Sequence, residues 1–150
     1  HTGVFGVVGI VLLLLVKYVA LNNIPPVFMI AILLFMPVVS RWAMVYAIFA
    51  YPYARPSGLG IAFKQSTHWP EFTTATIIAL VIAAAMFPLF SITGLLLIFG
   101  VWIITTAFSF YLKNKFAGLT GDTYGAINEV AEVMALLLAT AIWTIAGKLR

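Results

Sequence analysis

Three of the four acidic residues of this 150-residue chain lie close together, immediately before or just inside one apolar run. They are Asp122, Glu129 and Glu132 in the segment GLTGDTYGAINEVAE, and the apolar run continues from Val133 to Ile145. Carboxylates at the mouth of a membrane-spanning helix are costly to bury, and by default they mark a functional site. The segment also carries three glycines, which allow a tight turn or a close approach of a ligand to the backbone. We therefore expect the functional site here.

Helical spacing predicts which of these side chains face the same way. Glu129 and Glu132 are three residues apart and share one helix face, while Asn128 and Glu132 are four apart and are neighbours. Asp122 has two readings, because aspartate is a preferred helix N-cap and also suits a ligand site at the positive end of a helix dipole. For the two glutamates, the alternative to a site is a location among lipid headgroups.

Arg41 is a cation inside a second apolar run. Ten residues separate it from Tyr51, which is about 15 Å of helix, so snorkelling cannot bring its whole length to water. A charged group at that depth needs an acidic partner or a wet cavity. We expect Arg41 in the interior of the helix bundle, paired with Glu129 or Glu132.

Arg55 and Lys64 belong to the long connection Tyr51–Glu71. Its sequence YPYARPSGLG is rich in proline and glycine and predicts an ordered turn rather than another helix. Because the turns that carry Arg55, Lys64 and Asp122 fall on the same predicted side of the membrane, we expect the three residues to line one cavity.

The composition determines the class of protein. Hydrophobic residues make up 64% of the chain and charged residues 8%, and the mean hydropathy is +1.15, which is too apolar for a soluble domain. The fold class predicted is all-α: a polytopic membrane helix bundle formed by residues 1–150 as a single integral membrane domain. The formal charge of +4 is scattered, so there is no basic face for nucleic acid. Cysteine is absent, which excludes disulfides and thiolate chemistry.

Five apolar segments are long enough, or nearly so, to cross a bilayer, which takes about 20 residues. Asn22-Asn23 and Pro25-Pro26 end the first segment, and Pro37 predicts a kink in the second. The segments are Gly3–Leu21, Val27–Ala50, Phe72–Phe87, Ser91–Leu112 and Tyr124–Gly147.

Five crossings place His1, the 51–71 connection and the 113–122 connection on one face of the membrane. That face carries more positively charged residues than the opposite face, which favours a cytoplasmic location for it. Its cations are Arg55, Lys64, Lys113 and Lys115, against Lys17, Lys148 and Arg150 on the other side.

Two other classes of function are open at this point. A small membrane transporter or channel subunit would also place Arg41 and Glu132 at membrane depth, but it predicts paired discontinuous helices near the midplane. A scaffold subunit would explain the glycines by helix packing and leaves the buried charges unexplained. His68, beside Trp69, is typical of an interfacial loop residue rather than a metal ligand.

Three stretches together resemble a known family. GLTGDTYGAINEVAE, RWAMVYAIFAYPYARPSGLG at Arg41–Gly60 and TGVFG at Thr2–Gly6 are similar, in matching order over nearly the whole chain, to the cobalamin synthases. These are the membrane-bound adenosylcobinamide-GDP ribazoletransferases. In that family TGVFG follows an Asp-rich, metal-binding region, so we expect this chain, which starts at His1, to be a fragment of a longer protein.

The resemblance implies an enzyme of the bacterial or archaeal cytoplasmic (inner) membrane. It would join α-ribazole, or its 5′-phosphate, to adenosylcobinamide-GDP with release of GMP, using Mg²⁺. Asp122 and Glu129 would be catalytic, Asp122 would also ligate metal, and the main metal ligands would lie upstream of His1, so this fragment alone would be inactive. The residues expected to bind substrate are Arg41, Arg55, Lys64, Asn128 and Glu132.

Overall fold

The computed structural model describes residues 3–86 and 92–148, and throughout them the regular structure is helical. This confirms the predicted all-α class. One isolated parallel β-bridge, between Tyr53 and Leu119, is the exception. The helices are α1 (Val4–Asn22), α2 (Pro26–Ala50), α3 (Leu59–Ser66), α4 (Trp69–Ala85), α6 (Thr93–Phe116) and α7 (Gly121–Lys148).

Proline, glycine and polar residues set the helix limits. Pro26 is the first residue of α2, where its missing N–H costs nothing. At the start of α4, the backbone N–H of His68 donates to the carboxylate of Glu71 at 2.9 Å, so His68 is an N-cap residue. α6 ends at Phe116 and is capped by Ala117, which adopts a left-handed conformation with φ of 57°. Pro37 lies inside α2, which nevertheless continues to Ala50 as one helix.

The five predicted apolar segments correspond to α1, α2, α4, α6 and α7, although Phe87 and Ser91 lie outside the described residues. The sequence predicted an ordered turn and no helix in the 51–71 connection. This prediction was wrong, because the connection contains α3. After Gly60, the sequence IAFKQS is free of helix breakers. Gly58, with φ of 117°, makes the turn into this helix.

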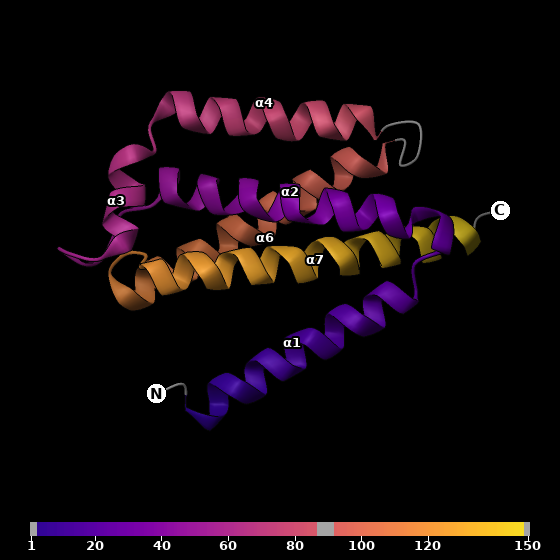
Figure 1. Cartoon of the computed structure of the whole chain (residues 1–150), viewed down its shortest axis with the longest axis horizontal. Helices are drawn as coiled ribbons and strands as arrows, with labels where there is room; N and C mark the ends of the chain where they lie inside the picture. The colour runs from indigo at the N-terminus through magenta and orange to yellow at the C-terminus, as the bar shows by residue number, and fades with distance from the viewer. Residues whose placement is uncertain (1–2, 87–91, 149–150) are drawn as a thin grey trace.

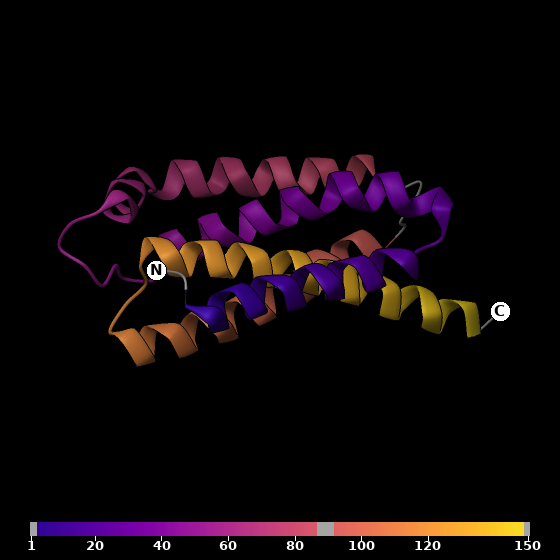
Figure 2. The same cartoon turned by 60° about the horizontal axis from the view of Figure 1, so that its bottom comes forward.

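α2 and α7 lie side by side through the centre of the bundle, with α4 against α2 and α6 against both (Figures 1 and 2). α1 runs obliquely and packs on α7. Small side chains let the central helices approach closely, as in other membrane bundles. Those that are buried in the core are Ala31, Ala43, Ala131, Ala135 and Ala139.

Within residues 3–86 and 92–148, three helices are long and apolar enough to cross a membrane: Pro26–Ala50, Thr93–Phe116 and Gly121–Ile145. A fourth crossing results if α3 and α4, which meet at a bend of 89°, form one broken span, and Gly6–Asn22 in α1 is a shorter apolar helix. The prediction of five crossings thus becomes three to four by these criteria. The chain is an integral membrane protein.

One end of the bundle gathers the polar connections, as predicted. The first residues of α1 and α7, the last residues of α6 and the whole of α3 lie at the left end of both views (Figures 1 and 2). His1 itself lies outside the described residues. This common end positions the candidate site.

Candidate functional site

Two loops are bonded to each other at this end of the bundle. The N–H of Ala54 donates to the carbonyl of Leu119 at 2.7 Å, and the N–H of Leu119 donates to the carbonyl of Pro52 at 2.8 Å. Gly118 makes this contact possible, because it has a φ of 149° and a Cβ there would lie 2.9 Å from the Cα of Ala54. Alanine would therefore meet both backbone strain and a backbone clash.

The first of these loops is also tied to the helices on either side. The Tyr51 hydroxyl donates to the carbonyl of Thr106 in α6 at 3.1 Å, and burial raises the pKa of this phenol. From α3, the Lys64 ammonium donates to the carbonyls of Ile48 and Phe49 at 2.7 and 2.9 Å. A cation at these carbonyls satisfies the end of α2 and suits the negative end of its dipole.

The second loop leads into α7 through a threonine cap. The N–H of Thr123 donates to the hydroxyl of Thr120 at 3.3 Å, and the N–H of Thr120 donates to the hydroxyl of Thr123 at 2.7 Å. Thr120 therefore caps α7, and the reading of Asp122 as the N-cap was wrong. Asp122 lies in the first turn of the helix, where a carboxylate is favoured by the dipole but is not used as the cap.

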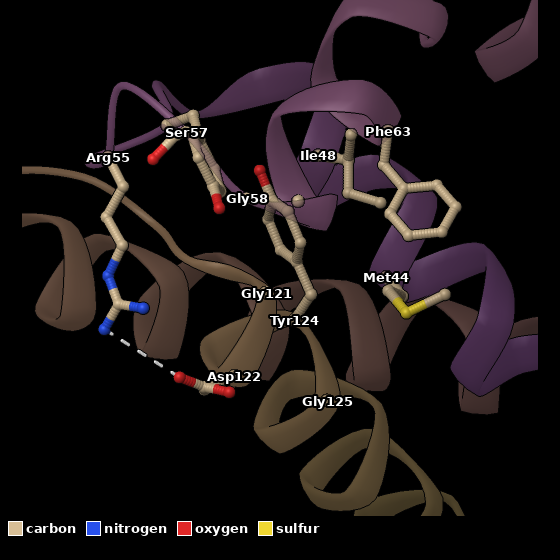
Figure 3. A pocket seen from close by; sticks show the side chains of 12 residues that line it. Met44, Ile48, Arg55, Ser57, Gly58, Phe63, Gly121, Asp122, Tyr124 and Gly125 are labelled. Carbon is tan, nitrogen blue, oxygen red and sulfur yellow. Dashed lines mark ion pairs between the residues drawn. The ribbon is translucent and has the colours of Figure 1, made fainter.

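A pocket of about 530 Å³ opens between the loops and the helices α2, α3 and α7. In Figure 3, Arg55, Ser57 and Asp122 lie on one side of Tyr124, and Met44, Ile48 and Phe63 lie on the other. The pocket therefore has a polar side and an apolar side. Its lining is Met44, Ile48, Tyr53, Arg55, Ser57, Gly58, Gly60, Phe63, Gly121, Asp122, Tyr124 and Gly125.

Arg55 and Asp122 face each other across the polar side of the pocket, as the dashed line in Figure 3 shows. The guanidinium and the carboxylate are 3.9 Å apart, and their side chains are 62% and 88% exposed. An exposed pair at this distance contributes little stability. Both groups therefore remain available to a ligand.

The structure brings together two of the three residues predicted to share a cavity. Arg55 and Asp122 line the pocket, whereas Lys64 is not among its lining residues. The prediction for Lys64 was wrong because its ammonium is held by two backbone carbonyls of α2. Its contribution is to fix α3 against α2, and α3 supplies Phe63 to the pocket.

Glu129 and Glu132 pair with Lys17 of α1. Its ammonium lies 2.7 Å from a carboxylate oxygen of each glutamate. The second oxygen of Glu132 accepts hydrogen bonds from Ser40 at 3.3 Å and from the amide of Asn128 at 3.2 Å. Lys17 was expected at the opposite face of the membrane. It lies inside the bundle because α1 packs on α7 beside these two carboxylates, and the ammonium compensates their negative charge.

The prediction that Arg41 pairs with Glu129 or Glu132 was wrong. Ser40 is fully buried and faces Glu132, and the next residue of a helix points about 100° away. Arg41 is therefore turned out of this contact and is exposed. It forms no ion pair within the part of the chain that the structure describes. By spacing it shares a face of α2 with Met44 and Ile48.

Several pocket residues were not predicted. Tyr124 lies within the acidic segment itself, and its spacing of three residues from the apolar Ile127 would have indicated an inward side chain. Tyr53 and Ser57 lie in the loop whose order was predicted. Lys17, the only cation inside the first apolar segment, carried the same signal of an intramembrane charge that singled out Arg41.

The residues in the pocket do not by themselves form a magnesium site. Asp122 is its only carboxylate, and among the described residues no three His, Cys, Asp or Glu side chains are grouped to hold a metal ion. Mg²⁺ is usually held by one or two carboxylates together with waters and substrate phosphates. Asp122 alone therefore supplies at most one protein ligand.

Known proteins resemble this chain closely. A protein from Desulforamulus reducens described as adenosylcobinamide-GDP ribazoletransferase is 34% identical over 139 residues, 92% of this chain and 54% of its own length. Two further proteins have the same description. The one from a Roseiflexus strain is 35% identical over 92% of this chain and 50% of its own length. The one from Synechococcus elongatus is 38% identical over 89% of this chain and 54% of its own length.

This chain thus spans about half the length of the curated relatives it matches. No solved structure matches it. The model of the family described as cobalamin-5-phosphate synthase matches residues 1–140, and the chain belongs to that family.

Proposed function

We propose that the full-length protein transfers α-ribazole, or its 5′-phosphate, onto adenosylcobinamide-GDP and releases GMP. The observation that carries this proposal is the pocket at the polar end of the bundle, where Arg55 in one loop faces Asp122 in the first turn of α7. The relatives' description as adenosylcobinamide-GDP ribazoletransferase gives the reaction. The product would be adenosylcobalamin or its phosphate.

The chemistry assigns roles to the two charged pocket residues. Release of GMP requires the bond between the two phosphates of the GDP group to break, while a ribose hydroxyl of the ribazole forms a new bond to the phosphorus that stays with cobinamide. Arg55 can contact phosphate oxygens in a bidentate way. Asp122, 88% exposed, can accept the proton that the attacking hydroxyl loses.

The deeper residues fit this chemistry less directly. Glu129 is seven residues beyond Asp122, about 10 Å along the helix, and one of its oxygens binds Lys17. Its catalytic role stays a prediction, as do the substrate-binding roles of Arg41, Asn128 and Glu132. A transporter would favour paired broken helices at mid-membrane, whereas α2, α6 and α7 are continuous.

Two further points of the proposal come from the family resemblance. The reaction would use Mg²⁺, with Asp122 as one ligand beside ligands from elsewhere in the full-length protein. The protein would lie in the cytoplasmic membrane of a bacterium or archaeon, with the pocket toward the cytoplasm. Arg55, Lys64, Lys113 and Lys115 near the pocket end support this orientation.

The test is GMP release from adenosylcobinamide-GDP by the full-length protein in nanodiscs with α-ribazole and Mg²⁺. Arg55→Gln should lower turnover strongly, and Lys115→Gln, at an exposed position on α6, serves as the control. This chain alone should bind nucleotide weakly and release no GMP. The proposal is refuted if the full-length protein binds both substrates and releases no GMP.

A further inference from the structure

The two sides of the pocket differ in chemistry, and this difference selects a ligand. Met44, Ile48 and Phe63 form the apolar side with side chains that have no hydrogen-bonding groups other than a weakly accepting thioether. Arg55 and Ser57 provide charge and a hydroxyl on the opposite side. A ligand that fills both sides must therefore have an apolar end and an anionic or polar end.

We propose that this pocket receives a nucleoside monophosphate whose base is apolar and aromatic. Its base would lie against Met44, Ile48 and Phe63, and its phosphate toward Arg55. This assignment rests on the proposed function and deepens it. Of the two substrates, it gives the pocket to the ribazole, whose base is an apolar benzimidazole, rather than to the guanosine end of adenosylcobinamide-GDP.

The apolar side discriminates between bases because it offers almost no hydrogen-bonding groups. The edge of guanine carries several donors and acceptors, which would lose their hydrogen bonds to water and find no replacement against methionine, isoleucine and phenylalanine. A benzimidazole with methyl groups loses little by the same transfer and gains from apolar burial. The pocket volume of about 530 Å³ is in the range of small-molecule sites.

The polar side is suited to a phosphate. Arg55 is 62% exposed and its 3.9 Å contact with Asp122 is loose, so the guanidinium can turn to an incoming anion at little cost. Gly125 adds room in the pocket wall, since a Cβ there would meet nothing within 4 Å. Charge and exposure therefore coincide on the side opposite the apolar wall.

Tyr124 stands between the two sides, and its hydroxyl is buried without a hydrogen-bond partner among the described residues. The residue is 3% exposed. Buried hydroxyls in native proteins almost always have a partner, and a ribose or phosphate oxygen of the ligand would supply one. Because the hydroxyl is covered, ligand entry should separate the ring of Tyr124 from that of Tyr53, whose centroid is 6.2 Å away.

The experiment measures binding of α-ribazole 5′-phosphate and of GMP to the full-length protein in nanodiscs by equilibrium dialysis. Both ligands carry one ribose and one phosphate, and they differ in the base and in the configuration of its bond to the ribose. We expect α-ribazole 5′-phosphate to bind at least about tenfold more tightly than GMP. Phe63→Ala should weaken ribazole phosphate binding by about tenfold and leave GMP binding unchanged. Phe116→Ala, at another half-exposed phenylalanine near this end of the bundle, should change neither.

Tyr124→Phe provides a second variant with a different readout. It should weaken binding of the ribazole phosphate by about tenfold without lowering the Tm of the free protein, because the hydroxyl loses no protein partner. Tyr18→Phe removes the same group from an exposed position on α1 and should change neither quantity. A lower Tm with unchanged binding would show that Tyr124 is structural only, and would overturn its part of the proposal.

The assignment of the pocket and the proposed function can fail separately. A Phe63→Ala variant that leaves ribazole phosphate binding unchanged, or that weakens GMP binding instead, would overturn the assignment while GMP release continued. Selective binding of ribazole phosphate with no GMP release would refute the proposed function and support the assignment of the pocket.

Discussion

Replacing Lys17 by methionine should destabilise the protein more than replacing any exposed lysine. The substitution keeps the length and apolar stem of the side chain and removes only the ammonium group. Two carboxylates would then lose the cation that lies 2.7 Å from each of them. The side chains of Lys17 and Glu132 are only 16% and 12% exposed, so water cannot readily take over the role of the ammonium.

The size of the effect follows from the burial of each partner. Removing one member of a buried ion pair costs about 3–5 kcal/mol. Glu129 is 47% exposed and can turn to solvent, and Glu132 keeps its hydrogen bonds from Ser40 and Asn128. We therefore expect about 3 kcal/mol, at the low end of that range. For a domain of this size this lowers the Tm by roughly 6–12 °C.

The assay is thermal unfolding of the full-length protein in detergent, with Lys115→Met as the control. Lys115 is exposed and contacts the rings of Tyr111 and Phe116 and, at 3.4 Å, the Tyr111 hydroxyl, so its loss should shift the Tm by less than about 2 °C. Combining Lys17→Met with Glu132→Gln should recover more than half of the lost stability, because the uncompensated charge is gone. A Lys17→Met variant as stable as the control, or a double variant less stable than the single one, would refute this account of the cluster.

Three other predictions concern the candidate site. Gly118→Ala should cost about 2 kcal/mol and abolish GMP release, because its Cβ would lie 2.9 Å from the backbone of Ala54; Gly9→Ala, where a Cβ meets nothing within 4 Å, should be neutral or slightly stabilising in the same melting experiment. Lys64→Met should lower the Tm by a few degrees through the loss of two hydrogen bonds to the end of α2, and an unchanged Tm would contradict its bridging role. Asp122→Asn should lower turnover at least tenfold with an unchanged Tm, because the carboxylate is 88% exposed; unchanged turnover would remove Asp122 from the reaction.

The limits of the long helices could be predicted because local chemistry determines them. Pro25 and Pro26 mark the join between α1 and α2, whereas α6 continues past the predicted Leu112 to Phe116. α3 was not predicted because the prolines and glycines of YPYARPSGLG favour a turn, although the residues after Gly60 have ordinary helix propensities. Propensity could also not show that α3 lies where Lys64 reaches the last carbonyls of α2.

The pairing of buried charges was harder to predict than their presence. Hydropathy shows that Lys17, Arg41, Glu129 and Glu132 all occur in or beside apolar runs, but it does not give the rotation of each helix about its axis. Ser40 rather than Arg41 faces α7, and this difference of one residue redirects the contact by about 100°. The sequence therefore predicted intramembrane ion pairs correctly and assigned the wrong cation.

The pocket and the ion cluster occupy one face of α7. Asp122, Gly125, Glu129 and Glu132 follow one another at intervals of three, four and three residues, which keeps them on a single stripe about 15 Å long. Asp122 and Gly125 line the pocket at the end of the bundle, and the two glutamates bind α1 deeper in the membrane.

This arrangement gives different surroundings to carboxylates of one helix face. The deeper pair is neutralised by Lys17 and anchors α1, whereas Asp122 meets only a loose, exposed arginine. On the facing helix, Arg41, Met44 and Ile48 also follow at intervals of three and four, so Arg41 shares the pocket side of α2, although it is exposed and does not line the pocket. Among the described residues Arg41 forms no ion pair, and its role in substrate binding stays a prediction.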